Sequence, residues 1–115
     1  MSARLTPEAR ALRTMTEAAW QRTVEGIATA NGWKWYHPSK PGIRANGTVR
    51  YVVPGYPDLT LVRGDRLLFA ELKREGPQGV VSQAQQDWMT ALGETAAECY
   101  LWRPSDLAIV REVLR

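Results

Sequence analysis

Apolar residues recur at helical spacing in the first third of the chain. A threonine and a proline at 6–7 are typical of a helix start. Residues 14–17 (Thr-Met-Thr-Glu) match a capping box, whose glutamate reaches back to the helix start. Asn and Gly at 31–32 are a typical C-terminal stop. The pattern therefore predicts helices over 7–13 and 16–31, either separate or fused. The apolar stripe of the second helix is made by Trp20, Val24, Ile27 and Ala28.

Short alternating segments come next. Residues 33–37 (WKWYH) are aromatic and alternate, which predicts a strand. Residues 38–48 are rich in turn formers, and Asn46-Gly47 is a tight-turn signal within them. Residues 50–53 are suited to pair back as a hairpin arm. The segment 38–53 is otherwise expected to be a long irregular loop.

Two more regular strands are predicted over 58–63 and 66–73. Only Gly64-Asp65 separates them, so they are expected to form an antiparallel hairpin. A loop over 74–81 follows, because it holds two glycines and a proline.

The last third predicts a helix, a strand and a helix. Ser82 caps a helix that ends at Gly93, and residues 97–102 are typical of a strand. A final helix begins at Pro104 and runs through Val113. A helix that crosses between strands makes the last pairing parallel. The expected fold is therefore a mixed α/β sheet with helices packed on both faces.

Composition limits the class of protein. The chain has 115 residues, 44% of them hydrophobic and 23% charged, which suits one globular domain over 1–115 with a core of its own. No repeat or linker divides it. No apolar run approaches the roughly 18 residues of a membrane helix, and no signal-peptide pattern is present. A single cysteine excludes an internal disulfide, so we expect a cytoplasmic protein.

The net charge of +3 and the pI near 9.4 favour a polyanionic partner without proving one. The same charge would also keep a small protein in solution.

Candidate chemistry is found at one end of the predicted hairpin. Glu71 and Lys73 share a face because they are two residues apart on a strand. Asp58 opens the antiparallel partner strand, so it is expected beside them. Carboxylates gathered in this way favour Mg²⁺ or Mn²⁺, which can activate water against a phosphodiester. A structural role remains open for each residue alone, with Asp58 capping a turn and Glu71 and Lys73 forming an exposed pair.

The combination of motifs resembles a known nuclease family. Gly55-Tyr56-Pro57-Asp58-Leu59 followed by Glu71-Leu72-Lys73 resembles the PD-(D/E)XK nuclease superfamily. The S-x-x-Q-x-x-W spacing of residues 82–88 is similar to that of the VRR-NUC (virus-type replication-repair nuclease) family, especially its small stand-alone phage and bacterial members. The likeness runs from Thr16 to about Leu107. It includes Glu17 with Gln21, Gly32-Trp33, Tyr36-His37 and residues 100–106 (YLWRPSD).

The resemblance implies a restriction-endonuclease-like core and a role for each motif residue. Asp58, Glu71 and the Leu72 carbonyl would hold the metal. Lys73 would position or activate the water. Glu17 would bind a second metal or a metal-bound water, and Gln85 would support the site or contact the DNA backbone.

Other residues are less specific. Five basic residues are candidates for DNA contact, although a solvated loop is an equal alternative for most of them. His37, the only histidine, is expected to satisfy a local hydrogen bond, with assistance to the metal site or DNA contact as the alternative. Trp20 and Trp88 lie on inner helix faces and are expected in the core. The candidates for DNA contact are Lys34, Lys40, Arg44, Arg50 and Arg74.

The expected function is a Mg²⁺- or Mn²⁺-dependent endodeoxyribonuclease. The resemblance implies a Holliday-junction resolvase that acts as a homodimer and leaves 5′-phosphate and 3′-hydroxyl ends. Two alternatives stay open: a flap or nicking nuclease of phage replication and repair, and a catalytically weak DNA-binding accessory module. A purely structural dimerisation domain has no use for clustered acids.

Overall fold

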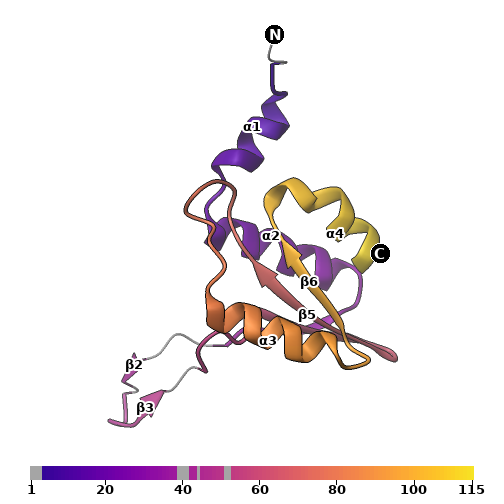
Figure 1. Ribbon diagram of the computed structural model, residues 1–115. Helices are drawn as coiled ribbons and strands as arrows, with labels where there is room; N and C mark the ends of the chain where they lie inside the picture. The colour runs from indigo at the N-terminus through magenta and orange to yellow at the C-terminus, as the bar shows by residue number, and fades with distance from the viewer. Residues whose placement is uncertain (1–3, 39–41, 44, 51–52) are drawn as a thin grey trace.

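Helices flank a four-stranded mixed sheet, which is built from β-strands before and after the third helix (Figure 1). The computed structural model describes residues 4–38, 42–43, 45–50 and 53–115. In chain order the elements are α1 (Pro7–Thr14), α2 (Glu17–Ala30), β1 (Lys34–Tyr36), β2 (Gly42–Ile43), β3 (Val49–Arg50), β4 (Leu59–Arg63), β5 (Arg66–Leu72), α3 (Gln83–Gly93), β6 (Glu98–Trp102), the 3-10 helix η1 (Pro104–Asp106) and α4 (Leu107–Leu114).

The sheet has the strand order β1-β4-β5-β6. β4 and β5 form the expected antiparallel hairpin, in which Leu59 lies opposite Ala70. β6 pairs with β5 in parallel, and Glu71 lies opposite Leu101. Both predicted pairings are confirmed, because the short turn and the crossover through α3 leave the chain no other direction.

The main core lies between this sheet and helices α2 and α4. Trp20 is fully buried, and its indole N–H donates to the Trp102 carbonyl at 2.9 Å, which ties α2 to β6. Trp33 is buried beside the C-terminus, where its indole N–H donates to Leu114 at 2.9 Å. The alternating positions of the strands supply the rest of this face, including Leu59, Leu61, Leu68, Ala70 and Leu72.

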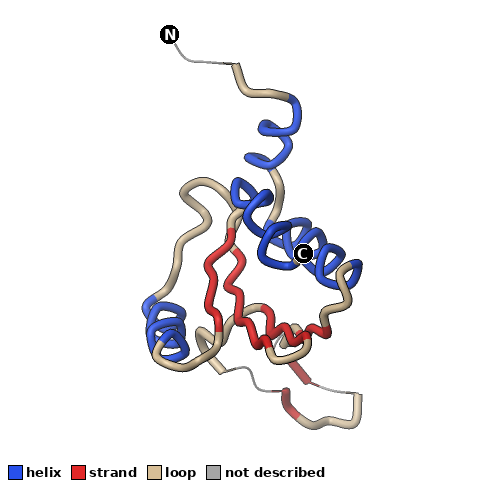
Figure 2. The backbone as a smooth tube through the Cα atoms, turned by 90° about the vertical axis from the view of Figure 1, so that its right-hand side faces the viewer, coloured by secondary structure: helices blue, strands red, loops and turns tan. Residues whose placement is uncertain are grey.

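Helix α3 covers the other face of the sheet (Figure 2). Phe69 and Glu71 are buried on this side, between the core-facing residues of β5. Trp88 was expected in the core, but it lies outside the main core, on the α3 side of the sheet. Its ring is half-buried and packs edge-on against Tyr56, with centroids 5.2 Å apart, because α3 faces the loop before β4 there and not the α2 side of the sheet.

The start of α2 differs from the predicted capping box. Thr16 is the N-cap and its side chain accepts a hydrogen bond from the Ala19 N–H, so Glu17 is the first helical residue and does not reach back. Met15 is extended between the helices, which makes α1 and α2 separate. The final helix also begins differently, because Pro104 starts a 3-10 turn before α4.

The segment after β1 is more regular than expected. β2 and β3 pair with each other as a small antiparallel ribbon, in which Gly42 lies opposite Arg50. The arm expected to pair back over 50–53 is found at Arg50, which lies in β3 and is joined to β2 through a turn at Asn46-Gly47. Residues 51–52 lie outside the described part.

Helix α1 projects from the body of the molecule (Figure 1). Only its last turn reaches the core, through Leu12 and the following Met15. None of the helices in the described ranges is long and apolar enough to cross a membrane.

Candidate active site

The β4–β5 hairpin brings Asp58 to the end of β5. The Leu72 N–H donates to Asp58 Oδ2 at 2.7 Å, which fixes this carboxylate just before β4. The N–H and C=O of one strand residue point to the same side. The Leu72 carbonyl therefore faces the side on which Asp58 lies. The two groups expected from the resemblance as neighbouring oxygen donors are thus adjacent in the fold.

Glu71 is the buried acid of this site. Its side chain is 1% exposed, and in the described part of the chain it is the one charged residue in the buried class. Gln85 Nε2 donates to Glu71 Oε1 at 3.0 Å. Glu71 Oε2 is also buried but has no hydrogen-bond partner among the described residues. An exposed structural role for Glu71 is therefore excluded.

The surroundings of Glu71 disfavour its negative charge. Burial removes solvation, and the neighbouring Asp58 carboxylate adds to the effect, so the pKa of Glu71 is raised to about 9. Lys73 opposes this shift, and Glu17 adds to it. Two adjacent carboxylates, one of them with an unsatisfied oxygen in the described structure, are the donor set that a hard divalent cation fits.

Gln85 joins the start of α3 to the site. Its Oε1 accepts from the Ser82 N–H at 2.9 Å, while the Ser82 hydroxyl accepts from the Gln85 N–H. This reciprocal pair is a capping box, which the sequence analysis missed although Ser82 and Gln85 have the S-x-x-Q spacing that signals one. The free amide N–H group then reaches Glu71. One side chain therefore both begins α3 and orients the buried acid.

His37 and Gly55 support the loop that carries Asp58. A carbonyl only accepts, so His37 Nδ1 donates to the Asp58 carbonyl across 2.8 Å. His37 therefore makes a hydrogen bond, as expected, but not to a local group: its partner is a site residue 21 positions further along the chain. Gly55 has φ +79° and approaches the backbone of Ala84 at the start of α3. Glycine is required here for two reasons: the left-handed backbone conformation disfavours other residues, and the Ala84 backbone leaves no room for a Cβ.

Lys73 and Glu17 lie at the rim of the site. Lys73 follows β5 directly, and its N–H donates to the Trp102 carbonyl at 3.1 Å. Glu17 is exposed at the N-terminal end of α2. In the ranges described, no three His, Cys, Asp or Glu side chains are gathered closely enough to hold one metal ion together. The structure therefore does not gather Glu17 with Asp58 and Glu71, and its role with a second metal stays a prediction.

The candidates for DNA contact fall into three groups. Lys34 is exposed on the edge strand β1. Arg74 is half-buried, its carbonyl accepts from Arg103 Nη1 at 2.8 Å, and its buried Nε lacks a partner in the described chain. Lys40 and Arg44 lie outside the described residues, and of Arg50 only the backbone is described.

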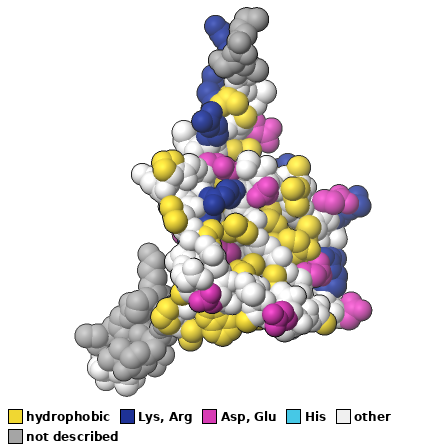
Figure 3. All heavy atoms as spheres, viewed as in Figure 1, with side chains coloured by type: hydrophobic (Ala, Val, Ile, Leu, Met, Phe, Trp, Pro, Cys, Tyr) yellow, Lys and Arg dark blue, Asp and Glu magenta, His cyan; other side chains and the backbone are white. Residues whose placement is uncertain are grey.

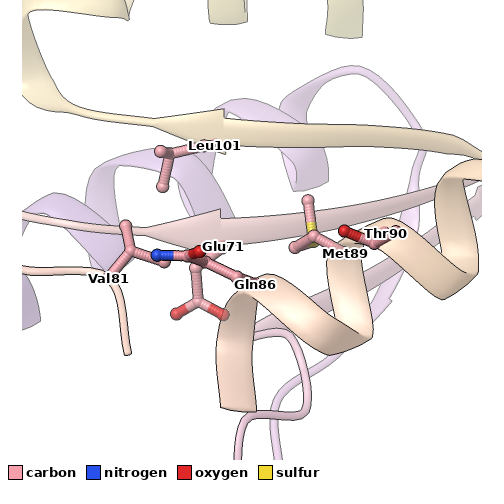
Figure 4. A pocket seen from close by; sticks show the side chains of 6 residues that line it. All are labelled: Glu71, Val81, Gln86, Met89, Thr90 and Leu101. Carbon is pink, nitrogen blue, oxygen red and sulfur yellow. The ribbon is translucent and has the colours of Figure 1, made fainter. Parts of the chain in front are cut away.

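A hollow of about 290 Å³ lies beside Glu71, between β6 and α3 (Figure 4). Leu101 lines one side of this hollow, and the Glu71 carboxylate on the other side points away from Leu101. The lining residues are Glu71, Val81, Gln86, Met89, Thr90 and Leu101.

A scan against protein-family models, a search of curated proteins and a search of solved structures each found no match to this chain.

The raised pKa of Glu71 predicts how stability depends on pH. An unfolded glutamate has a pKa of 4.5, whereas folded Glu71 keeps its proton up to about 9. The contribution of protonated Glu71 to folding stability is therefore fully present below the unfolded pKa of 4.5. It is lost as the pH rises through the folded pKa of about 9. In EDTA we expect the melting temperature, followed by circular dichroism, to fall by several degrees between about pH 5.5 and 8.5.

A bound divalent metal should oppose this fall of the melting temperature with rising pH. The reason is that carboxylates bind the metal in their deprotonated form, which is more populated at high pH. Mg²⁺ or Mn²⁺ is expected to raise the melting temperature more at the alkaline end. Glu75 and Glu98 have lowered pKa values, so their contributions are complete before this range begins. A melting temperature in EDTA that stays constant or rises across the range would contradict the assignment.

Proposed function

We propose that this chain is a metal-dependent DNA endonuclease of the VRR-NUC type with a PD-(D/E)XK core. The observation that carries the proposal is the pair formed by Asp58 and Glu71 at the end of the β4–β5 hairpin. Glu71 is 1% exposed and has an oxygen with no partner in the described structure. A buried carboxylate left in this state costs free energy, which a bound cation offsets.

Asp58, Glu71 and the Leu72 carbonyl would hold a Mg²⁺ or Mn²⁺ ion. Such an ion polarises a phosphodiester oxygen and makes bound water a stronger nucleophile. Gln85 orients Glu71 through its amide, and the Leu72 N–H orients Asp58. Because both acids are held by hydrogen bonds, their oxygens need little rearrangement before the reaction.

Lys73 would act on the attacking water and on the phosphate. The water oxygen forms a bond to phosphorus while the bond from phosphorus to the 3′ oxygen breaks. The elements of water are thus divided between a 5′-phosphate and a 3′-hydroxyl. The ammonium group of Lys73 hydrogen-bonds the water and offsets the negative charge that develops on phosphorus.

DNA is the proposed substrate because the chain is basic overall and the site suits phosphodiester chemistry. Specialisation for four-way junctions and action as a homodimer follow from the family resemblance. They agree with the size of the chain, since 115 residues are too few to enclose a branched substrate alone.

The test incubates labelled four-way junction, flap and linear duplex with the protein in Mg²⁺, Mn²⁺ or EDTA, beside Lys73→Ala. We expect metal-dependent cleavage of the junction and a loss of at least about 100-fold in the variant, with DNA binding retained. The structure-matched control is Arg111→Ala, which also removes one positive charge, from an exposed position on α4.

The set of DNA substrates that is cleaved distinguishes the candidate functions. Paired cuts across the junction support the resolvase, and equal cutting of every substrate supports a nuclease without that specialisation. Cutting of the flap alone supports a flap nuclease. No cleavage in either metal, with tight binding retained, would overturn the enzyme proposal in favour of a DNA-binding module.

A further inference from the structure

Helix α1 packs on the rest of the protomer only in part, through Leu12 against the core and through contacts with η1. None of its eight residues is buried in the described structure, and it projects from the body (Figure 1). Helices this short are marginal in water without a packing partner. Its exposed side is polar and not apolar, so the feature suits a charged partner better than a hydrophobic one.

The charge of this segment is positive. Residues 4–14 contain three arginines, Arg4, Arg10 and Arg13, against the single acid Glu8. Arg10 and Arg13 are exposed and lie almost one turn apart, and with Leu5 and Thr14 they line an open hollow. Figure 3 shows Lys and Arg side chains along one side of this projection. The arm therefore presents guanidinium groups to a single side.

These arginines continue toward the candidate active site. Arg13 and Arg103 both lie near Glu75, whose pKa they help to lower. Arg103 in turn donates to the Arg74 carbonyl at 2.8 Å, and Arg74 follows Lys73 directly in the chain. Basic side chains thus extend from the arm to the rim of the site, with Glu75 bound to the Ser105 N–H between them.

We propose that α1 is a DNA-binding arm in which Arg10 and Arg13 bind backbone phosphates of the duplex beside the scissile bond. The proposal rests on the proposed endonuclease function. An eight-residue helix spans about 12 Å, which corresponds to roughly three or four base pairs of duplex. The contacted phosphates therefore lie a few nucleotides from the cut.

The test measures binding of a labelled duplex by fluorescence anisotropy in EDTA, over a series of salt concentrations. The arm variant is Arg10→Gln with Arg13→Gln. The control is Arg111→Gln with Arg115→Gln, which removes the same charge from exposed positions near the C-terminus. Circular dichroism and light scattering of both variants report folding and oligomeric state.

We expect the arm variant to weaken binding by about tenfold and to reduce the slope of log affinity against log salt by about 2. The control should change affinity by less than about twofold. An unchanged salt slope, or an equal loss in the control, would overturn the proposal. So would a wild-type dimer that becomes monomeric in the arm variant, since α1 would then bind a second copy.

Failure of the enzyme proposal would look different. A wild-type protein that binds duplex through the arm, with the full salt slope, but never cleaves in Mg²⁺ or Mn²⁺ would leave the arm assignment intact.

Discussion

Glu71→Gln is expected to lower the single-turnover rate of DNA cleavage by at least about 1,000-fold while leaving the protein folded. Glutamine keeps the size of the side chain and can still accept the hydrogen bond from Gln85. It replaces the oxygen that has no described partner by an amide and removes the charge that a divalent cation needs. The loss should therefore appear in the chemical step and not in DNA affinity.

The same variant should change the response of stability to pH. A glutamine has no proton to release, so the fall in melting temperature expected for the metal-free wild type between about pH 5.5 and 8.5 should disappear. Added Mg²⁺ or Mn²⁺ should no longer raise the melting temperature.

Glu98→Gln is the matched control for Glu71→Gln. Glu98 also lies on a strand of the sheet, but it pairs with Arg66 at 2.8 Å and accepts from Tyr100, away from the site. The control should lose some stability and keep cleavage. A Glu71→Gln protein that cleaves at more than about a tenth of the wild-type rate would remove Glu71 from the metal site.

Gly55→Ala is expected to destabilise the protein by about 3 kcal/mol and to reduce cleavage as well. A Cβ at this position would overlap the Ala84 backbone and lie 2.7 Å from the Gln85 backbone nitrogen. Overpacking of this kind costs about 1–3 kcal/mol, and a left-handed backbone adds about 1 kcal/mol for a residue other than glycine. A loss of that size lowers the melting temperature by roughly 10 °C or more in a domain of this size.

Gly32→Ala separates the two causes. Gly32 has the same φ of +79°, but among the described residues nothing lies within 4 Å of its added Cβ. Its cost should be the backbone strain alone, about 1 kcal/mol, with cleavage unchanged. Equal destabilisation of the two variants would show that the close approach of the Asp58 loop to α3 is unimportant.

The outline of the fold could be predicted because its determinants are local. The stripe of Trp20, Val24 and Ala28 indicates a helix with one buried face, and Gly64-Asp65 allows only a tight turn between two strands. Hairpin geometry then places Asp58 near the end of β5 without any knowledge of the rest of the molecule.

Local pattern was less informative where two signals competed. Both Thr14 and Thr16 are suitable caps, but Thr14 is the last residue of α1, where its hydroxyl donates to the Arg10 carbonyl, and Thr16 caps α2. The turn of the small β2–β3 ribbon was predicted from Asn46-Gly47, but the bounds of its strands were not, because each has only two residues, too few to show a period.

The sequence alone determined which residue types the site contains and which end of the hairpin they occupy, because strand alternation and a short turn are properties of the chain itself. Tertiary structure decided their chemical state. Burial of Glu71 under α3, its bond to Gln85 and the His37 bond to the Asp58 carbonyl each join segments that are 14 or more residues apart. Solvation and charge proximity depend on every group packed around a side chain, so the raised pKa of Glu71 emerges only when the helix has closed over the sheet.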